Sequence, residues 1–166
     1  MSPTRTDEAA VNSWHARPDD LPTLRRLVRS YIDTWFPPGV AWSAADQQLV
    51  AALPVEHGSP SGTALLASAG SGAPVGCVLL RPHPTQDGAA ELRKLHVTPA
   101  ARHIGVGAGL LDAAERTAEE LGYRQLVLDA AANRTAAVAL HLQRGFHRSA
   151  STGTHHDMTT MHRALP

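Results

Sequence analysis

The sequence has one cysteine, few aromatic residues and no long apolar run, and each shortage excludes a class of protein. Cys77 has no partner for an internal disulfide, and its place in the apolar run VGCVLL is typical of a buried residue in a reducing compartment. No apolar run approaches the roughly 20 residues that span a bilayer. The N-terminal residues MSPTRTDEAAVNS include no hydrophobic signal segment. We therefore expect a cytoplasmic protein that does not bind a membrane.

The chain also lacks a net charge, because 15 basic and 15 acidic residues cancel. No overall field then favours nucleic acid as a partner. All the basic residues except Lys94 are arginine. Arginine suits forked contacts with phosphate or carboxylate, so this bias reflects either a local anion site or the coding composition. The length of 166 residues suits one domain, which we expect to span residues 12–166 after a flexible segment at residues 1–11.

Hydrophobic periodicity and turn signals predict an α/β domain. Short apolar or alternating runs predict strands over residues 12–17, 63–69, 75–81, 89–97, 124–130, 146–150 and 155–163. Apolar residues at helical spacing predict helices from the cap PDDLP to Trp35, over residues 43–53, from the glycines after residue 104 to Gly122, and over residues 135–144. The order indicates antiparallel hairpins, then one parallel strand–helix–strand crossover, then a final hairpin.

Three glycines, Gly105, Gly107 and Gly109, stand at alternate positions in the segment ARHIGVGAGLL, where a helix begins. Glycine weakens a helix interior by about 1 kcal/mol relative to alanine. The first turn of a helix presents unpaired N–H groups, and glycines let a phosphate approach them. The segment lacks the lysine and Ser/Thr of a Walker loop and the GxGxxG spacing of a Rossmann loop. From Arg102 to Gly107 it matches a different pattern: Arg or Gln, two residues, Gly, one residue, then Gly or Ala.

Four motifs, in this order and spacing, are similar to the core of the GNAT superfamily of N-acetyltransferases. They are ELRKLHV, RHIGVG, LVLDAAAN and AVALHLQRGF, and the resemblance covers about residues 75–150. The resemblance implies a mixed, mostly antiparallel sheet of about six to seven strands. It also implies a central parallel pair of strands that splays apart, and about four flanking helices.

By the same resemblance, acetyl-CoA is the expected co-substrate. The backbone of Leu95, His96 and Val97 would pair with its pantetheine arm. Its pyrophosphate would lie on the amides of the glycine-rich segment, which are those of Arg102, His103, Ile104, Gly105, Val106 and Gly107. Asn133 matches the asparagine that contacts the cofactor arm. The alternatives for Asn133 are that it caps the last helix or serves both roles.

Amide formation from a thioester needs a group that takes the proton of the amine, since an amine of pKa near 10 is mostly protonated at pH 7. Glu91 opens the strand ELRKLHV and resembles the glutamate that some family members use as general base. Ordered water is the alternative base, and Glu91 would then pair with neighbours or solvent. Strand alternation predicts two faces: Glu91, Arg93, Leu95 and Val97 on one, and Leu92, Lys94 and His96 on the other.

The departing thiolate needs a proton, since the thiol of coenzyme A has a pKa of about 8.5. Family members usually carry tyrosine where this sequence has His141, in the run AVALHLQRGF. Imidazole titrates near pH 6.5, so His141 is predicted to donate this proton. The alternative is that His141 only packs or forms hydrogen bonds, and the thiolate leaves unaided.

Four aromatic residues lie close together in the sequence: Tyr31, Trp35, Phe36 and Trp42. In the family the segment after the first helix often borders the acceptor site, so these residues would form a wall for an apolar, aromatic or cationic amine. The alternative is that they cap the core. The remaining histidines, His155, His156 and His162 among them, lack metal-ligand spacing, and we expect no metal.

These features together predict a cytoplasmic N-acetyltransferase that moves the acetyl group of acetyl-CoA to a primary amine. We expect direct attack in a ternary complex, because a covalent relay needs an accessible nucleophile and Cys77 lies in an apolar run. A non-catalytic acyl-CoA-binding sensor or interaction module on the same fold is the alternative, supported by the missing tyrosine. The sequence does not identify the amine, and it leaves a homodimer open.

Overall fold

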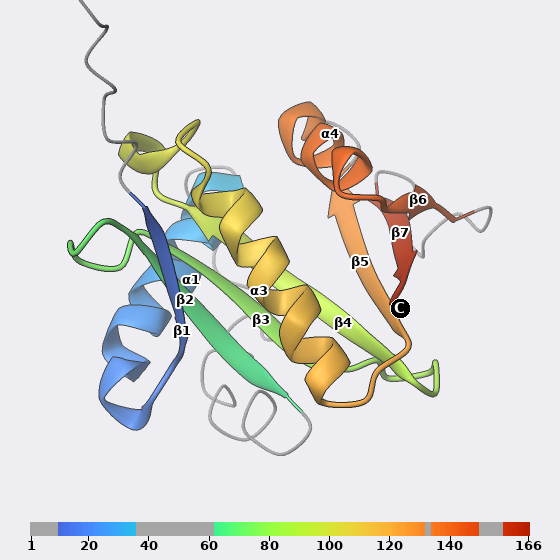
Figure 1. Cartoon of the computed structure of the whole chain (residues 1–166). Coiled ribbons are helices and arrows are strands. Elements are labelled where there is room, and N and C mark those ends of the chain that lie inside the picture. The colour runs from blue at the N-terminus through green and yellow to red at the C-terminus, as the bar shows by residue number, and fades with distance from the viewer. Residues whose placement is uncertain (1–9, 36–61, 132–133, 150–157) are drawn as a thin grey trace, which may run out of the picture.

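The computed structural model describes residues 10–35, 62–131, 134–149 and 158–166. In these residues a seven-stranded sheet has the order β1-β2-β3-β4-β5-β7-β6 (Figure 1). The strands are β1 Val11–His15, β2 Thr63–Ala69, β3 Gly76–Pro82, β4 Ala89–Val97, β5 Gln125–Ala131, β6 His147–Arg148 and β7 Met158–Ala164. Neighbouring strands run antiparallel except β4 and β5, which are parallel. The predicted mixed sheet with one central parallel pair is therefore confirmed.

Three α-helices lie in the described part of the chain: α1 Leu21–Trp35, α3 Val106–Glu120 and α4 Thr135–Gln143. Short 3₁₀ turns precede two of them, η1 Pro18–Asp20 before α1 and η2 Pro99–Ala101 before α3. The helix expected over residues 43–53 lies outside the described residues. The other predicted helices and strands are present, and their ends differ from expectation by at most three residues, as fraying ends do.

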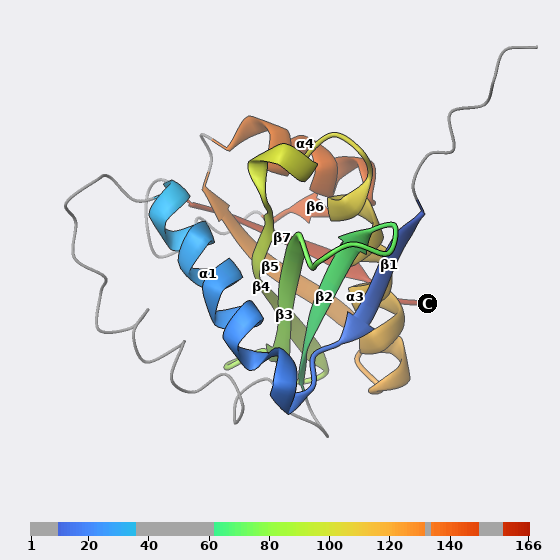
Figure 2. The ribbon, with the colours of Figure 1, turned by 90° about the vertical axis from the view of Figure 1, so that its left-hand side faces the viewer.

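Helices cover both faces of the sheet, with α1 on one side and α3 on the other (Figure 2). The apolar stripe of α1 packs on the inner strands, in a core of Leu24, Leu27, Val28, Ile32, Ala64, Leu66, Cys77 and Leu79. The opposite core contains the apolar face of α3, Val138 of α4 and the other inward residues of β2 to β5. Because both faces are covered, the sequences of the central strands are nearly continuous apolar runs.

A β-bulge in β4 changes the predicted faces of that strand. Cys77 of β3 pairs with His96 and Leu79 pairs with Arg93, so Lys94 and Leu95 together lie opposite one residue. Lys94 takes a left-handed φ of 52°, and the thiol of Cys77 donates to its carbonyl oxygen at 3.6 Å. One extra residue reverses the alternation beyond it.

The predicted separation of Leu92 from Leu95 is therefore wrong. Both residues pack in the core under α3, whereas the side chain of His96 contacts Ser30 of α1 on the other face. Glu91 alternates with Leu92, so Glu91 and His96 share the face of α1. The bulge thus places an imidazole on the α1 side, close to the point where the two parallel strands part.

The parallel pairing is short. It runs from Ala89 opposite Gln125 to Leu92 opposite Leu128 and does not continue. Beyond this point β4 bulges, while β5 keeps its antiparallel pairing with β7 as far as Ala131 opposite Met158. The two strands therefore leave each other with unpaired backbone on their facing edges.

Candidate active site

A cavity of about 470 Å³ lies where β4 and β5 no longer pair. This volume is in the range of sites for small molecules and cofactors. It is bordered by the end of β4, the loop that follows, the first turns of α3 and α4, and the last residue of α1. The lining residues are Trp35, Leu95, His96, Val97, Ala101, Arg102, His103, Gly105, Val106, Gly107, Ala108, Arg134, Thr135, Ala136, Ala137 and Leu140.

The start of α3 supplies free backbone donors to this cavity. The first intrahelical hydrogen bond runs from the N–H of Gly109 to the carbonyl of Gly105 at 2.9 Å. The N–H groups of Val106, Gly107 and Ala108 therefore have no intrahelical acceptor. They lie at the positive end of the helix dipole, which favours a bound anion.

Arg102 adds a full positive charge beside these amides. Its Nε donates to the carbonyl oxygen of Val97 at 2.9 Å, which fixes the side chain across the loop. The loop itself turns through two left-handed residues, His103 with φ 65° and Gly105 with φ 91°. Unpaired amides, a fixed guanidinium and a cavity suit a pyrophosphate group.

The three glycines of the segment serve different purposes. Gly105 is needed for its positive φ, since a Cβ there would meet nothing within 4 Å. A Cβ on Gly107 would stand 3.4 Å from Leu140 Cδ2, across the cavity. A Cβ on Gly109 would lie 2.8 Å from Val11 Cγ1 of β1. Only the first two therefore shape the cavity, and the third allows α3 to pack closely on the edge strand.

Arg134 forms the wall opposite the loop, at the start of α4. Its guanidinium carbon lies 3.9 Å from the centroid of the Trp35 ring, and its Nη1 donates to the hydroxyl of Tyr31 at 3.0 Å. Burial lowers the pKa of Arg134, and the charge of Arg102 adds to this, while Tyr31 opposes it. Arginine remains protonated at neutral pH despite such shifts.

His96 borders the cavity on the side of α1 and is only 2% exposed. Its Nε2 lies 3.1 Å from the hydroxyl oxygen of Ser30, and its ring meets Tyr31 edge-on. Burial, with the charges of Arg102 and Arg134, lowers the pKa of His96 to about 4. The imidazole is therefore neutral at pH 7.

The structure brings most of the residues predicted for the cofactor around one cavity. Leu95, His96 and Val97 line it from β4, and five residues of the segment from Arg102 to Gly107 line it from the loop. Ile104 does not line it and is 45% exposed. Asn133 lies outside the described residues. The sequence analysis gave no role to Arg134, the residue after Asn133, although it lines the cavity. An arginine at the start of the last helix was the signal that could have indicated it.

Of the predicted aromatic wall, Trp35 lines the cavity and is 42% exposed. Tyr31 packs against the core under α1 and reaches Arg134 with its hydroxyl. Phe36 and Trp42 lie outside the described residues. In the described part of the chain both Tyr31 and Trp35 thus contact the guanidinium of Arg134, which lines the cavity, whereas Tyr31 does not line it.

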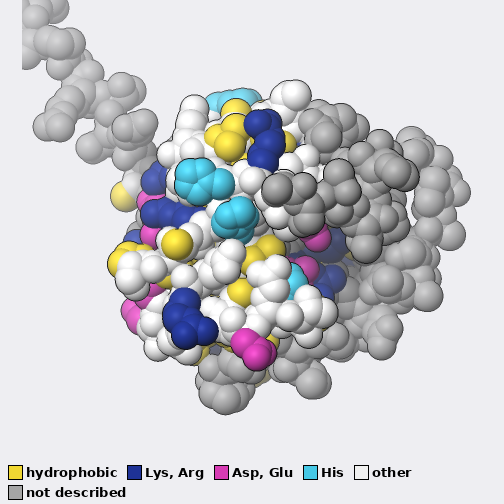
Figure 3. All heavy atoms as spheres, turned by 90° about the vertical axis from the view of Figure 1, so that its right-hand side faces the viewer, with side chains coloured by type: hydrophobic (Ala, Val, Ile, Leu, Met, Phe, Trp, Pro, Cys, Tyr) yellow, Lys and Arg dark blue, Asp and Glu magenta, His cyan; other side chains and the backbone are white. Residues whose placement is uncertain are grey.

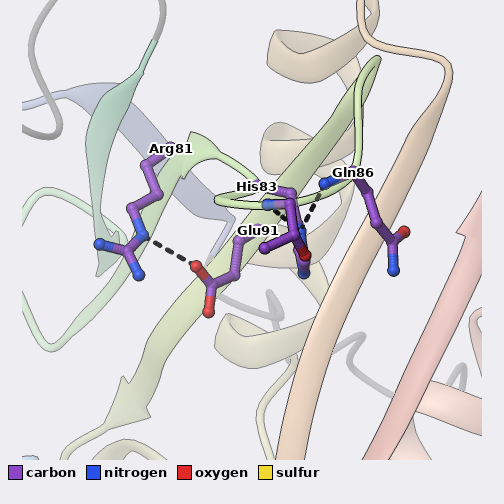
Figure 4. Close-up of polar contacts among 5 residues, drawn as sticks. Arg81, His83, Gln86 and Glu91 are labelled. Atoms are coloured by element: carbon purple, nitrogen blue, oxygen red, sulfur yellow. Dashed lines mark hydrogen bonds and ion pairs between the residues drawn. The ribbon is translucent and has the colours of Figure 1, made fainter. Parts of the chain in front are cut away.

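Glu91 does not line the cavity. Its carboxylate accepts a hydrogen bond from Nε of Arg81 at 2.8 Å, across the antiparallel pair β3–β4 (Figure 4). The same view shows His83, whose Nδ1 accepts hydrogen bonds from the backbone N–H groups of Thr85 and Gln86 in the turn. Glu91 faces the α1 side within the paired part of β4, and its role as base stays a prediction.

His141 is 5% exposed and does not itself line the cavity, although Leu140, its neighbour in α4, does. Its ring meets Phe146 edge-on at 5.6 Å, and its Nδ1 is buried without a hydrogen-bond partner. Burial, followed by the charge of Arg134, lowers the pKa of His141 to about 4. The expectation that this imidazole titrates near pH 6.5 is therefore wrong, because the ring is packed away from water.

A second, shallower hollow of about 780 Å³ lies along the outer face of α1, away from the parting strands. It is lined by Pro22, Arg25, Arg26, Arg29, Ser30, Asp33 and Thr34. Charges of both signs and histidines are interspersed on the face that carries β6 and β7 (Figure 3). There the rings of His147 and His162 lie 6.3 Å apart. Among the described residues no group of three or more His, Cys, Asp or Glu could hold a metal ion, and none of the helices is long and apolar enough to cross a membrane.

Comparison with known proteins agrees with the geometry of the cavity. The model of the acetyltransferase (GNAT) family matches residues 24–146. The chain belongs to the GNAT family of acetyltransferases. An uncharacterised N-acetyltransferase of Schizosaccharomyces pombe is 30% identical over 146 residues, which are 88% of this chain and 85% of that protein.

Solved structures of GNAT proteins share the fold. A GNAT-family acetyltransferase of Staphylococcus aureus superposes with a TM-score of 0.76 at 18% identity, covering 95% of this chain and 100% of that one. The PaiA N-acetyltransferase of Thermoplasma acidophilum, in complex with coenzyme A, gives a TM-score of 0.70 at 17% identity, covering 94% and 99%. The predicted GNAT-type fold is thus confirmed.

Proposed function

We propose that this GNAT protein transfers an acetyl group from acetyl-CoA to a primary amine by direct attack in a ternary complex. The observation that carries the proposal is the cavity at the parting of β4 and β5, with unpaired amides at one end. The amine nitrogen forms a bond to the acetyl carbon, the carbon–sulfur bond breaks, and the amine loses a proton while the thiolate gains one.

Acetyl-CoA fits the residues of the cavity. Its pyrophosphate would be held by the amides of Val106, Gly107 and Ala108 and by the charge of Arg102. The free edge of Leu95 to Val97 offers backbone groups to an extended arm, which would add to the sheet as a further strand. Gly107 leaves room between Val97 and Leu140 for such an arm.

Direct attack is supported by the environment of Cys77. The thiol is fully buried under α1, and burial raises its pKa to about 12. A thiol that does not ionise near neutral pH is a poor nucleophile. In the described part of the chain Cys77 therefore does not serve as an acetyl carrier.

We propose Glu91, directly or through water, as the group that takes the proton of the amine. Glu91 is on the α1 face of β4, the same face as His96, and its carboxylate is oriented by Arg81. Water in the cavity is the competing base, and its use would leave Glu91 as a structural partner of Arg81.

For the departing sulfur, we propose that neutral His141 donates a hydrogen bond, and that the proton which the thiolate gains comes from water. The imidazolium form is scarce at neutral pH, whereas a neutral ring keeps one N–H, and Nδ1 has no hydrogen-bond partner among the described residues. A hydrogen bond to a charged group contributes about 1.5–3 kcal/mol.

Substitution of His141 tests this role. His141→Phe should lower turnover about 10- to 100-fold with unchanged acetyl-CoA affinity, and His141→Tyr should retain most of it. The pH–rate profile of the natural protein should lack an inflection from His141 between pH 6 and 8. Wild-type turnover of His141→Phe across pH 6 to 10 would show that the ring only packs against Phe146.

The alternative function is that of a sensor that binds acyl-CoA without turnover, and the replacement of the usual tyrosine by His141 favours it. Release of free thiol from acetyl-CoA, measured with a panel of primary amines, separates the two. We expect amine-dependent release for at least one class of amine. Calorimetric binding of acetyl-CoA with no release for any amine would favour the sensor.

A further inference from the structure

Arg134 is a cation held on the cavity wall by two aromatic rings. We propose that the acceptor is an amine that also carries a carboxylate, as an amino acid does, and that Arg134 binds this carboxylate. The proposal rests on the proposed acetyltransferase function and specifies its substrate class.

The first observation is the way the guanidinium is fixed. The centroid of the Trp35 ring lies 3.9 Å from the guanidinium carbon, and the Tyr31 hydroxyl accepts a hydrogen bond from Nη1. Among the described residues, the side chain of Arg134 has no other hydrogen-bond acceptor, and its Nε is buried without a partner. A guanidinium has five N–H donors in a rigid fork that matches the two oxygens of a carboxylate.

The second observation is the charge balance of the cavity. No acidic side chain lines it in the described residues. Ion pairs elsewhere in the described residues include those of Arg81 with Glu91, Arg144 with Asp112 and Arg163 with Glu115, and none of these six residues lines the cavity. Among the described residues, no carboxylate on the cavity wall compensates the charges of Arg102 and Arg134, and the charge of Arg102 contributes to the lowered pKa of Arg134. Two bound anions would balance these charges.

The third observation is that the two arginines belong to different sides of the sheet. Arg102 lies with the amides at the start of α3, where the pyrophosphate is expected. Arg134 rests on Tyr31 and Trp35 of α1, on the opposite face. Since the phosphates of the cofactor would occupy the α3 side, the anion bound by Arg134 would belong to the second substrate.

The same contacts disfavour a cationic acceptor at this wall. The Tyr31 ring already has Lys94 Nζ at 5.0 Å and the Arg134 guanidinium carbon at 5.2 Å from its centroid. Another cation would meet these two charges instead of a bare aromatic face. Of the acceptors that the sequence left open, a polyamine or other purely cationic amine therefore fits least.

The test compares matched acceptors in the thiol-release assay. Each set contains a free amino acid, its carboxamide and the amine left after removal of the carboxylate, for example phenylalanine, phenylalaninamide and phenethylamine. We expect kcat/KM for the best free amino acid to exceed that of both partners at least tenfold. Equal or higher values for the carboxamide and the plain amine in every set would overturn the proposal but leave the acetyltransferase function intact. Thiol release with none of the amines would overturn both.

Substitution of Arg134 provides the second arm. Arg134→Met should raise KM for the free amino acid at least tenfold, with little effect on KM for the plain amine, and Arg134→Lys should give an intermediate value. Calorimetric affinity for acetyl-CoA should stay near wild type in both variants, which also shows that they fold. Arg102→Met, the matched control, should instead weaken acetyl-CoA. If Arg134→Met weakens acetyl-CoA and leaves KM for the amino acid unchanged, Arg134 serves the cofactor and the proposal is wrong.

Discussion

Substitution of Gly107 tests where acetyl-CoA lies, because the structure shows which atoms a side chain at this position would contact. A Cβ at this position would stand 3.4 Å from Leu140 Cδ2 and 3.8 Å from Val97 Cγ2. Both distances are ordinary contacts, so the methyl group of Gly107→Ala fits. Gly107→Leu extends further carbon atoms from that point into the cavity, between two of its lining residues.

The two variants should differ in their affinity for acetyl-CoA and agree in their change of stability. If the leucine displaces a phosphate from one amide of α3, the loss is about 1.5–3 kcal/mol, and the Kd for acetyl-CoA rises at least about tenfold. Gly107→Ala should keep near wild-type affinity. Because glycine is a poor helix former, both variants gain up to about 1 kcal/mol of stability. In a domain of this size that corresponds to a Tm increase of roughly 2–4 °C.

The assay is calorimetric titration with acetyl-CoA, paired with thermal unfolding of the same samples. We expect Gly107→Leu to bind weakly while its Tm is at or above that of the natural protein. Wild-type affinity in folded Gly107→Leu would refute the placement of the cofactor. Equal weakening by Gly107→Ala would refute the steric explanation.

Four further predictions follow from other residues. Gly109→Ala brings a methyl group 2.8 Å from Val11 Cγ1 and should destabilise the fold by about 1–3 kcal/mol in denaturant unfolding, with acetyl-CoA affinity unchanged. The pKa values of His96 and His141 are about 4 in the folded chain and near 6.5 when unfolded. Protons then bind the unfolded chain first, so stability falls from pH 6.5 to 4, by at most about 1.4 kcal/mol per pH unit for each histidine; His141→Phe should show a shallower fall. Cys77→Ala should keep its turnover in the thiol-release assay, whereas loss of turnover would indicate that Cys77 carries the acetyl group as a covalent intermediate. Glu91→Gln should lower turnover most at low pH with unchanged calorimetric affinity for acetyl-CoA, and an unaltered pH–rate profile would assign the base to water.

Much of the fold was predictable because local signals and the overall topology agree. The apolar runs at residues 63–69 and 89–97 correspond to β2 and β4 with the predicted ends. The glycine-rich segment predicted the start of α3. In the structure Gly105 adopts a positive φ directly before the helix, and no side chain caps the helix end. The motif order then predicted the parallel pair, which needs a crossover helix of this length.

The departures arise where a side chain's position depends on distant contacts. Nothing in ELRKLHV signals that Lys94 adopts a left-handed φ, and the bulge there moves His96 to the α1 face. The lowered pKa of His141 follows from its packing against Phe146 and its nearness to Arg134, which the sequence does not show. Arg134 was missed for the same reason, because its partners are more than 95 residues away along the chain.

Initial-rate kinetics of thiol release test the central claim most directly. The rate is measured while the concentrations of acetyl-CoA and of the best amino acid are both varied. Direct transfer in a ternary complex predicts double-reciprocal lines that intersect, with release that depends on the amine. Parallel lines would indicate a covalent acetyl-enzyme, and release that does not depend on the amine would contradict acetyl transfer in this cavity.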